Sequence, residues 1–434
     1  MPGRDWQTSA YGTDPRQYMP EQRGPRHIQI QPRQRQRTPE QQRPEQQRQY
    51  TPEQMAPRHA LEQQAPRQSE IPQRKVGRQL QTVQPKNVLS YDEYRNWTIA
   101  QSLMLLIGVT LIGLLLFLPQ LGIHIMWNVI IPAAPAIVTL VPGIWRNICP
   151  MSTFSLLPRN FGLSFRMKLP NWLAASLTLI SILALYGIVP LRHLSLNING
   201  FTTAIMLAGA AVVALLLGII FEWRSAWCTT LCPIHPVERL YGFAPALSVK
   251  NARCTTCELC TAPCPDSMPS ASVPAAGTVG LQRALADFLV GSFFGFVWGW
   301  YQVPDFHGQV GMNEILIAFA WPFGGALVSY VIYLAMKRSV SDSAEQQKLL
   351  LKMFATAAVS TYYWYRIPAL VGFDPRSGQL YDLTFVLPDW FPMASQIITT
   401  AFFVWFLIIR NTSSGLTWQK RPAVAKRGKA AQAV

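Results

Sequence analysis

Residues 99–118 read IAQSLMLLIGVTLIGLLLFL, a run of 20 residues without a charged side chain. Such length and apolarity are typical of a helix that crosses a lipid bilayer. Similar runs recur along the chain, and eight membrane spans are predicted, at 99–118, 124–145, 172–191, 200–221, 284–303, 314–336, 353–372 and 394–410. The expected fold class is therefore an all-α polytopic membrane protein with about eight transmembrane helices in a 4+4 arrangement.

Composition supports this fold class. Hydrophobic residues make up 50% of the chain and charged residues only 14%, whereas soluble proteins average about 25% charged residues. An ordinary soluble globular protein is excluded on this ground. The 7 cysteines of the 434 residues are sparse and clustered, which excludes a small secreted domain held together by disulfides.

The first ninety residues differ in composition from the rest. They are rich in Arg, Gln and Pro and contain 15 Lys and Arg against 8 Asp and Glu. The few apolar side chains cannot offset the conformational entropy that the segment would lose on folding. A disordered tail is therefore predicted. This tail is either simply solvated or docks on a partner subunit or on anionic lipid. The interspersed glutamates and few aromatics argue against nucleic-acid binding.

The distribution of basic residues predicts the topology. From residue 91 onward the chain contains 23 Lys and Arg. With the tail in the cytoplasm and alternating spans, only Arg192, Arg366 and Arg376 fall outside, as the positive-inside rule requires. We therefore expect an even number of spans, with both termini in the cytoplasm. Tryptophans also lie near several predicted span ends, as in an interfacial aromatic belt: Trp97, Trp127, Trp172, Trp300 and Trp418.

All seven cysteines fall in loops assigned to the cytoplasm, where disulfides are rare and metal ligation is favoured. Four of them form the run CTTCELCTAPCP, with the spacing C-x2-C-x2-C-x3-C-P: Cys254, Cys257, Cys260 and Cys264. This spacing is typical of bacterial [4Fe–4S] ferredoxins, because one tight loop brings three thiolates to three corners of the cube. A zinc site is the alternative, although zinc usually joins two separated cysteine pairs.

A second pair of cysteines precedes this run. The sequence WCTTLCP contains Cys228 and Cys232 in a C-x3-C-P pattern, and an earlier WRNICP contains Cys149. Both follow a predicted pair of spans and a Trp-Arg pair, which indicates an internal duplication that brings the two Cys-Pro loops together. The fourth cluster ligand is either Cys264 or Cys232. A second centre would use Cys149 and Cys228, with Cys264 or a residue such as His235.

Four spans, a Cys-Pro loop after the second, a C-x3-C-P after the fourth and a ferredoxin run directly after it resemble the NapH/NosR/MauN-type membrane iron–sulfur proteins. The resemblance covers roughly residues 98–266. It implies electron transfer between the membrane quinone pool and a partner redox protein through cytoplasmic clusters. The chain departs from the family in having one ferredoxin run, a first Cys-Pro motif with a single cysteine, and four additional spans.

These features predict an integral-membrane electron-transfer protein of the bacterial cytoplasmic (inner) membrane, acting as a subunit of an oxidoreductase complex rather than a stand-alone enzyme. Its donor would be quinone or a soluble protein. The alternative is a scaffold or assembly subunit with a structural [4Fe–4S] cluster. The predicted parts are a disordered tail at 1–95, a four-helix membrane core at 96–223, a cytoplasmic iron–sulfur region at 224–282, a second four-helix membrane region at 283–411 and a basic cytoplasmic tail at 412–434.

Overall fold

The structure is a computed structural model that describes residues 87–221, 224–257, 267, 280–306, 308, 310–340, 343–374, 378–410 and 417–422. The predicted disordered tail, up to residue 86, therefore lies outside the described residues, as do Cys260, Cys264 and the last twelve residues, 423–434. Up to residue 257 the secondary structure comprises α1 (Tyr91–Phe117), α2 (Pro119–His124), η3 (Ile125–Ile130), α3 (Ile131–Leu140), α4 (Pro142–Ile148), α5 (Pro150–Asn160), α6 (Asn171–Leu191), η4 (Arg192–Leu196), α7 (Gly200–Ile220), η5 (Arg224–Leu231), α8 (Ile234–Tyr241), β1 (Val249–Lys250) and α9 (Cys254–Cys257), the η segments being π-helical. The remainder comprises α10 (Gly280–Trp300), α11 (Met312–Ser339), α12 (Ala344–Leu370), α13 (Phe391–Phe403), η9 (Val404–Ile409) and β2 (Gln419–Lys420).

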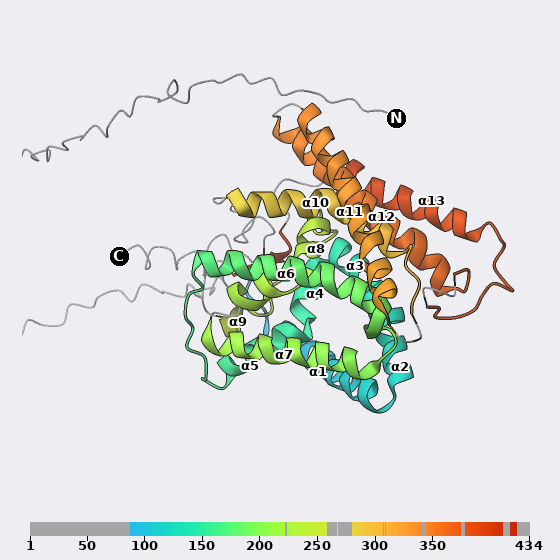
Figure 1. Ribbon diagram of the computed structural model, residues 1–434. Coiled ribbons are helices and arrows are strands. Elements are labelled where there is room, and N and C mark those ends of the chain that lie inside the picture. Colours follow the sequence, from blue (N-terminus) through green and yellow to red (C-terminus); the bar gives the residue numbers. More distant parts are fainter. Residues whose placement is uncertain are drawn as a thin grey trace, which may run out of the picture. The chain divides into compact units, whose positions relative to one another are not determined.

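The described chain is almost entirely helical, as Figure 1 shows, and the predicted multi-pass membrane character is confirmed. Six helical segments are long and apolar enough to cross a bilayer, namely Tyr91–Phe117, Pro119–Leu140, Trp172–Leu196, Gly200–Ile220, Met312–Ser339 and Phe391–Ile409. The other two predicted spans correspond to α10, whose apolar part is shorter, and to α12, which contains Lys348, Lys352 and Arg366. A count of eight crossings therefore stays a prediction.

The second predicted span was placed wrongly at its end. Residues 124–145 were expected to form one helix, but α3 stops at Leu140 and α4 begins at Pro142. Val141 between them has φ −138° and ψ 54°, outside the helical region. The ring of the following proline disfavours helical backbone at the preceding residue. This break turns the chain into the short α4 helix that leads to Cys149.

Polar residues of the loops gather into two groups, one at each end of the helices. One group, which we call the cysteine end, comprises residues 141–170, 224–257 and 417–422, where the N–H of Asn251 donates to the carbonyl of Lys420 at 3.0 Å. The opposite end comprises residues 124–130, 192–199, 301–306, 366–374 and 378–387. There the N–H of Phe306 donates to the carbonyl of His193 at 3.0 Å. This alternation agrees with the predicted up-and-down order of the spans.

The two predicted four-helix regions share one hydrophobic core. Its buried side chains come from both halves of the chain, for example Tyr186 and Tyr241 from the first and Phe296, Val359 and Phe403 from the second. Helix α10 contacts α6, and α12 contacts α8 (Figure 1). The halves are therefore packed against each other as one membrane domain and are not independent four-helix units.

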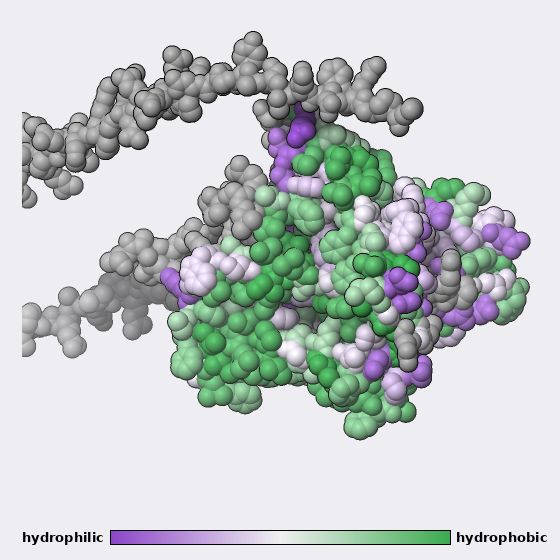
Figure 2. Space-filling view, viewed as in Figure 1, coloured by the Kyte–Doolittle hydropathy of each residue, from purple (hydrophilic) through white to green (hydrophobic). Residues whose placement is uncertain are grey.

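The surface of the spans is apolar. Figure 2 shows broad hydrophobic areas over the described part of the chain. They include exposed side chains such as Leu106 on α1, Val212 on α7, Leu327 on α11 and Ile398 on α13. Such exposure would be costly in water, but it is what a helix surface facing lipid requires. Trp172 is also exposed, at 71%, as an interfacial residue should be.

The aromatic-belt prediction is wrong for three other tryptophans. Trp127, Trp300 and Trp418 are buried inside the protein. The indole N–H of Trp127 donates to the carbonyl of Leu196 at 3.0 Å. Position near a span end therefore did not distinguish tryptophans that face lipid from tryptophans that join two segments of the protein.

Helices α10 and α11 approach each other closely through glycine. Gly291, Gly295 and Gly299 recur every four residues along α10, so they share one face of the helix. A Cβ added to Gly295 would overlap the carbonyl oxygen of Gly325 on α11. Small residues at this spacing let membrane helices pack backbone to backbone. An ion pair of 2.6 Å between Asp287 and Lys337 joins the same two helices.

Replacing Gly295 by Ala should lower the thermal stability of the detergent-solubilised protein by about 1–3 kcal/mol, because the new methyl group overpacks the contact. Circular dichroism against temperature measures this. The matched control is Gly324→Ala, where an added Cβ has open space. Equal melting temperatures for the two variants would show that α10 and α11 are not in close contact at Gly295.

A buried carboxylate organises the opposite end. Asp305 accepts hydrogen bonds from Nδ1 of His193 at 2.7 Å and from Nδ2 of Asn197 at 2.5 Å, and the guanidinium of Arg192 lies 3.8 Å away. Burial alone raises the pKa of Asp305, but the hydrogen bond from His193 and the charge of Arg192 outweigh burial and hold the pKa below 3.8. The carboxylate is therefore the stable form in the folded protein.

Because the folded pKa lies below the unfolded value, ionised Asp305 stabilises the fold above about pH 4, and this stabilisation is lost as the pH falls through the folded pKa. Asp305→Asn should lower the free energy of unfolding by about 3 kcal/mol at neutral pH, because the buried guanidinium of Arg192 loses the nearby negative charge. Between pH 5 and pH 3 the variant should also lose less stability than the parent, because it has no carboxyl group at position 305 that becomes protonated. Thermal unfolding measured across this pH range checks both results. The control is Asp389→Asn, which changes an exposed carboxylate. If the Asp305 variant and the parent showed identical dependence of stability on pH, the role of Asp305 would be excluded.

Candidate functional site

The two Cys-Pro loops meet at the cysteine end, as the duplication predicted. Cys149 lies between α4 and α5, and Cys232 lies between η5 and α8. Together with Cys228 they line one small cavity of about 30 Å³, which is also lined by Trp145, Arg146, Ser152, Trp227, Ile234 and Glu238. Cys149 is thus brought together with Cys228 and Cys232, which lie more than seventy residues later in the sequence.

A buried arginine links the two loops. Arg146, from the first loop, donates from Nε and Nη2 to the two carboxylate oxygens of Glu238, at 2.8 and 2.7 Å. The same Nη2 lies 2.8 Å from Nδ1 of His235 and 3.4 Å from the carbonyl oxygen of Cys228. This bidentate geometry is the strongest form of a charged hydrogen bond. It holds α8 in a defined position against α4.

His235 is not among the residues that line the cysteine cavity, and its role as a ligand of a second centre stays a prediction. Its Nδ1 faces Arg146. Burial, followed by the nearby charge of Arg146 and despite Glu238, lowers the pKa of His235 to about 4. The ring is therefore neutral at neutral pH and accepts a hydrogen bond from the guanidinium at Nδ1.

The start of the ferredoxin run is packed against the first Cys-Pro loop. Oδ1 of Asn147 accepts from the backbone N–H of Ala252 at 3.0 Å, and Nδ2 of Asn147 donates to the carbonyl of Lys250 at 2.9 Å. Arg253 donates to the carbonyl of Cys149 at 3.3 Å. Cys254 is the next residue and begins α9, which contacts α5. The first cysteine of the run is thus brought close to the loop that contains Cys149.

The other cysteines of the run cannot be placed in the same way. The backbone of Cys257 belongs to α9, but its side chain, like all of Cys260 and Cys264, lies outside the described residues. Within the described residues, no three Cys, His, Asp or Glu side chains are arranged to hold one metal ion. The predicted ligand set therefore stays a prediction, as does a second centre on Cys149 and Cys228.

The segment at 417–422 contributes to this site. The segment at 417–422 was predicted to belong to a cytoplasmic tail, but β2 pairs in parallel with β1, with Gln419 opposite Val249. Trp418 is fully buried, its indole N–H donates to the carbonyl of Gly242 at 2.6 Å, and its ring lies 4.7 Å from the guanidinium of Arg146. This cation–π contact covers the buried ion pair.

Gln419 connects the segment at 417–422 with α4, which leads to the first Cys-Pro loop. Its Nε2 donates to Oδ1 of Asn147 at 2.6 Å and to the carbonyl of Gly143 at 3.0 Å. The backbone N–H of Trp418 donates to the carbonyl of Ser267, just beyond the ferredoxin run, at 2.9 Å. Sequence analysis missed Asn147, Glu238 and Gln419, because their partners are distant in sequence and no short motif contains them.

The thiols of Cys149 and Cys232 have raised pKa values. Burial raises the pKa of Cys232 to about 12, with a smaller contribution from Cys149, and burial likewise raises the pKa of Cys149. A nucleophilic cysteine needs a lowered pKa and an exposed thiolate. These raised pKa values disfavour the thiolate at neutral pH, whereas a bound metal ion would deprotonate such thiols directly.

A large cavity connects the cysteine end with the opposite end. Its volume is about 280 Å³, and its walls are almost entirely apolar. Cys232 and Pro233 line it at one end, and Arg192, Trp300 and Tyr362 line it at the other. The indole N–H of Trp300 and the hydroxyl of Tyr362 are buried without a hydrogen-bond partner among the described residues.

Comparison of the chain with protein-family models, with curated proteins and with solved structures finds no match.

Replacing Gln419 by Ala should lower the stability of the protein by about 1–3 kcal/mol, because the carbonyl of Gly143 and the amide of Asn147 lose a buried donor. Thermal unfolding in detergent measures this loss. The neighbouring Lys420→Ala is the matched control, because the Lys420 side chain is exposed. If the Gln419 variant melted like the Lys420 variant, the end of the chain would not be part of the site.

Proposed function

We propose that this protein is a membrane electron-transfer subunit with one [4Fe–4S] cluster. Its ligands would be Cys254, Cys257, Cys260 and either Cys264 or Cys232. The protein would pass single electrons between a quinone or a soluble donor and a partner redox protein in a larger membrane complex. The resemblance and the distribution of basic residues favour the bacterial inner membrane, with the cysteine end in the cytoplasm.

The observation that carries this proposal is the packing of residues 250–254, which lead into the ferredoxin run, against the first Cys-Pro loop. Cys254 follows directly on Arg253, and the side chains of Arg253 and of nearby Asn251 are buried within the fold. The thiol donors and their spacing suit iron–sulfur chemistry better than zinc. When bound, such a cluster accepts and releases one electron. The protein's own contribution is to hold the loop rigidly through Asn147, Arg253 and the segment at 417–422.

Charges near the run would influence the redox potential. Arg253 donates to the carbonyl oxygen of Cys149 at 3.3 Å and directly precedes Cys254, so its positive charge lies next to the proposed cluster loop. A cation near a cluster stabilises the reduced form, whose charge is more negative. Arg253 would therefore raise the potential of the cluster.

The 280 Å³ cavity supports quinone as the membrane-soluble redox partner. Apolar walls suit a ring with an isoprenoid chain, and buried donors suit its carbonyl oxygens. Trp300 and Tyr362 offer such donors at one end. Cys232 at the other end of the cavity connects it with the cysteine loops.

Eight crossings remain part of the proposal. The ion pair between Asp287 and Lys337 joins the start of α10 to the end of α11. Near the C-terminal end of α12, Arg366 donates to the carbonyl of Trp127 at 2.7 Å. These contacts support α10 and α12 as full crossings that alternate with α11 and α13.

Cys257→Ser should abolish the electron paramagnetic resonance signal of the dithionite-reduced, anaerobically purified protein, because one of three compact ligands is lost. Cys264→Ser and Cys232→Ser identify the fourth ligand, because only the variant that removes this ligand should also lose the signal. Cys149→Ser is the control that keeps the signal.

Helical content by circular dichroism would confirm that each variant is folded. An unchanged signal in Cys257→Ser would contradict the ligand assignment. A cluster that is present in the parent protein but cannot be reduced by dithionite or reoxidised by a quinone analogue would favour a scaffold subunit instead of an electron carrier.

A further inference from the structure

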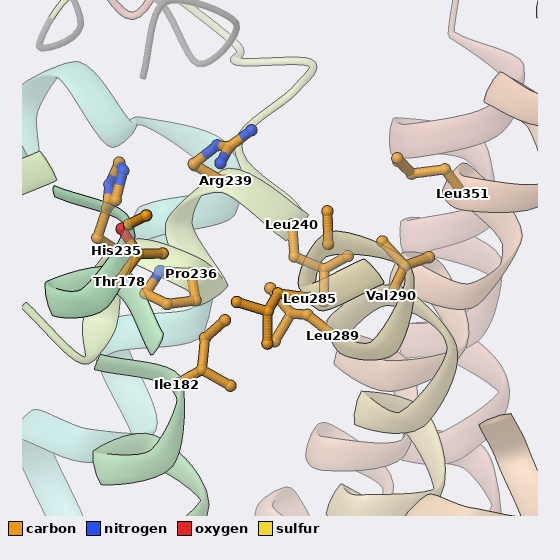
Figure 3. A pocket seen from close by; sticks show the side chains of 12 residues that line it. Thr178, Ile182, His235, Pro236, Arg239, Leu240, Leu285, Leu289, Val290 and Leu351 are labelled. Carbon is orange, nitrogen blue, oxygen red and sulfur yellow. The ribbon is translucent and has the colours of Figure 1, made fainter. Parts of the chain in front are cut away.

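A second pocket lies on the other side of α8 from the cysteine cavity. It has a volume of about 120 Å³ and lies between α6, α8 and α10, with Leu351 of α12 at its margin. Figure 3 shows two kinds of lining side chain in it. Polar His235, Thr178 and Arg239 lie along one side, and apolar side chains occupy the rest. The pocket therefore has a polar part and an apolar part.

Arg239 is an uncompensated cation at this pocket. Its Nε is buried without a hydrogen-bond partner, and none of the carboxylates in the described part of the chain forms an ion pair with it. The adjacent Glu238 is already held by Arg146. Burial, and then the charge of Arg146, lowers the pKa of Arg239 to about 10, so the guanidinium remains charged at neutral pH. A half-buried cation of this kind favours an anionic ligand.

The pocket lies near the start of the apolar stretch of α10. On α10 its lining begins at Leu285, one residue after the apolar stretch Ala284–Trp300 starts, and continues to Val290. At 1.5 Å per residue these positions lie within about 10 Å of the start of the stretch. On α6 the lining includes Thr178 and Ile182, again in the part of the helix nearer the cysteine end. Polar side chains thus lie at the mouth of a cleft between membrane helices.

We propose that this pocket binds an anionic phospholipid, with its phosphate on Arg239 and one acyl chain along Ile182, Leu285 and Leu289. Basic pockets between membrane helices at the cytoplasmic face recognise anionic headgroups in this way. The apolar wall favours a lipid over free phosphate, because phosphate alone would leave that wall exposed to water. Such a lipid would fill the gap between α6 and α10 and stabilise the contact between the two halves of the membrane domain.

The test compares Arg239→Gln with Arg338→Gln, which removes the same charge from an exposed position at the end of α11. Native mass spectrometry of protein purified in mild detergent should detect bound phosphatidylglycerol in the parent and in Arg338→Gln. Arg239→Gln should bind it about tenfold more weakly, since one charged contact is removed. A pocket-filling variant, Ala286→Phe, should also lose the lipid although Arg239 remains.

Thermal shifts on adding back lipid distinguish the sources of phosphate. We expect phosphatidylglycerol to stabilise the delipidated parent more than phosphatidylcholine does, and inorganic phosphate to have no effect. A shift with inorganic phosphate as large as that with phosphatidylglycerol would overturn a lipid as the ligand. Equal shifts with the two lipids, or undiminished binding by Arg239→Gln, would overturn recognition of the anionic headgroup by Arg239.

Discussion

The buried ion pair between Arg146 and Glu238 holds the cysteine end together. Two charges cannot be buried this deeply unless each satisfies the other, and breaking such a pair typically costs about 3–5 kcal/mol. Here the pair is bidentate, it is covered by the ring of Trp418, and it joins two loops that lie 92 residues apart. Every cysteine that the structure describes lies on a segment that this pair, or its neighbour Asn147, holds in place.

The same arrangement explains why the chain needs its second half. The first four spans could bring the two Cys-Pro loops together, but the segment that closes them, at 417–422, follows the last span. Trp418 and Gln419 can reach Gly242 and Asn147 only if the later helices return the chain to the cysteine end. The shared core of Tyr186, Phe296 and Phe403 fixes that return. The additional spans thus contribute directly to the geometry of the candidate site.

Much of the fold could be predicted because lipid acts as the solvent: a run such as residues 99–118 has few alternatives to a membrane helix. The meeting of the Cys-Pro loops followed from the repeated Trp-Arg and Cys-Pro pattern. The break at Val141 could also have been predicted, since Pro142 follows it. The role of Trp418 could not, because a tryptophan near a span end is equally consistent with a lipid interface. Glu238 and Gln419 act through partners distant in sequence, and a single sequence contains no signal for such pairs.

We propose that the cysteine end holds an iron–sulfur cluster. The most direct measurement is the iron, zinc and acid-labile sulfide content of the anaerobically purified full-length protein, supported by Mössbauer spectroscopy. The account predicts about four irons and about four sulfides per chain, in the form of a [4Fe–4S] cluster. Protein that retains its helical structure but contains no iron, or contains zinc without sulfide, would contradict it.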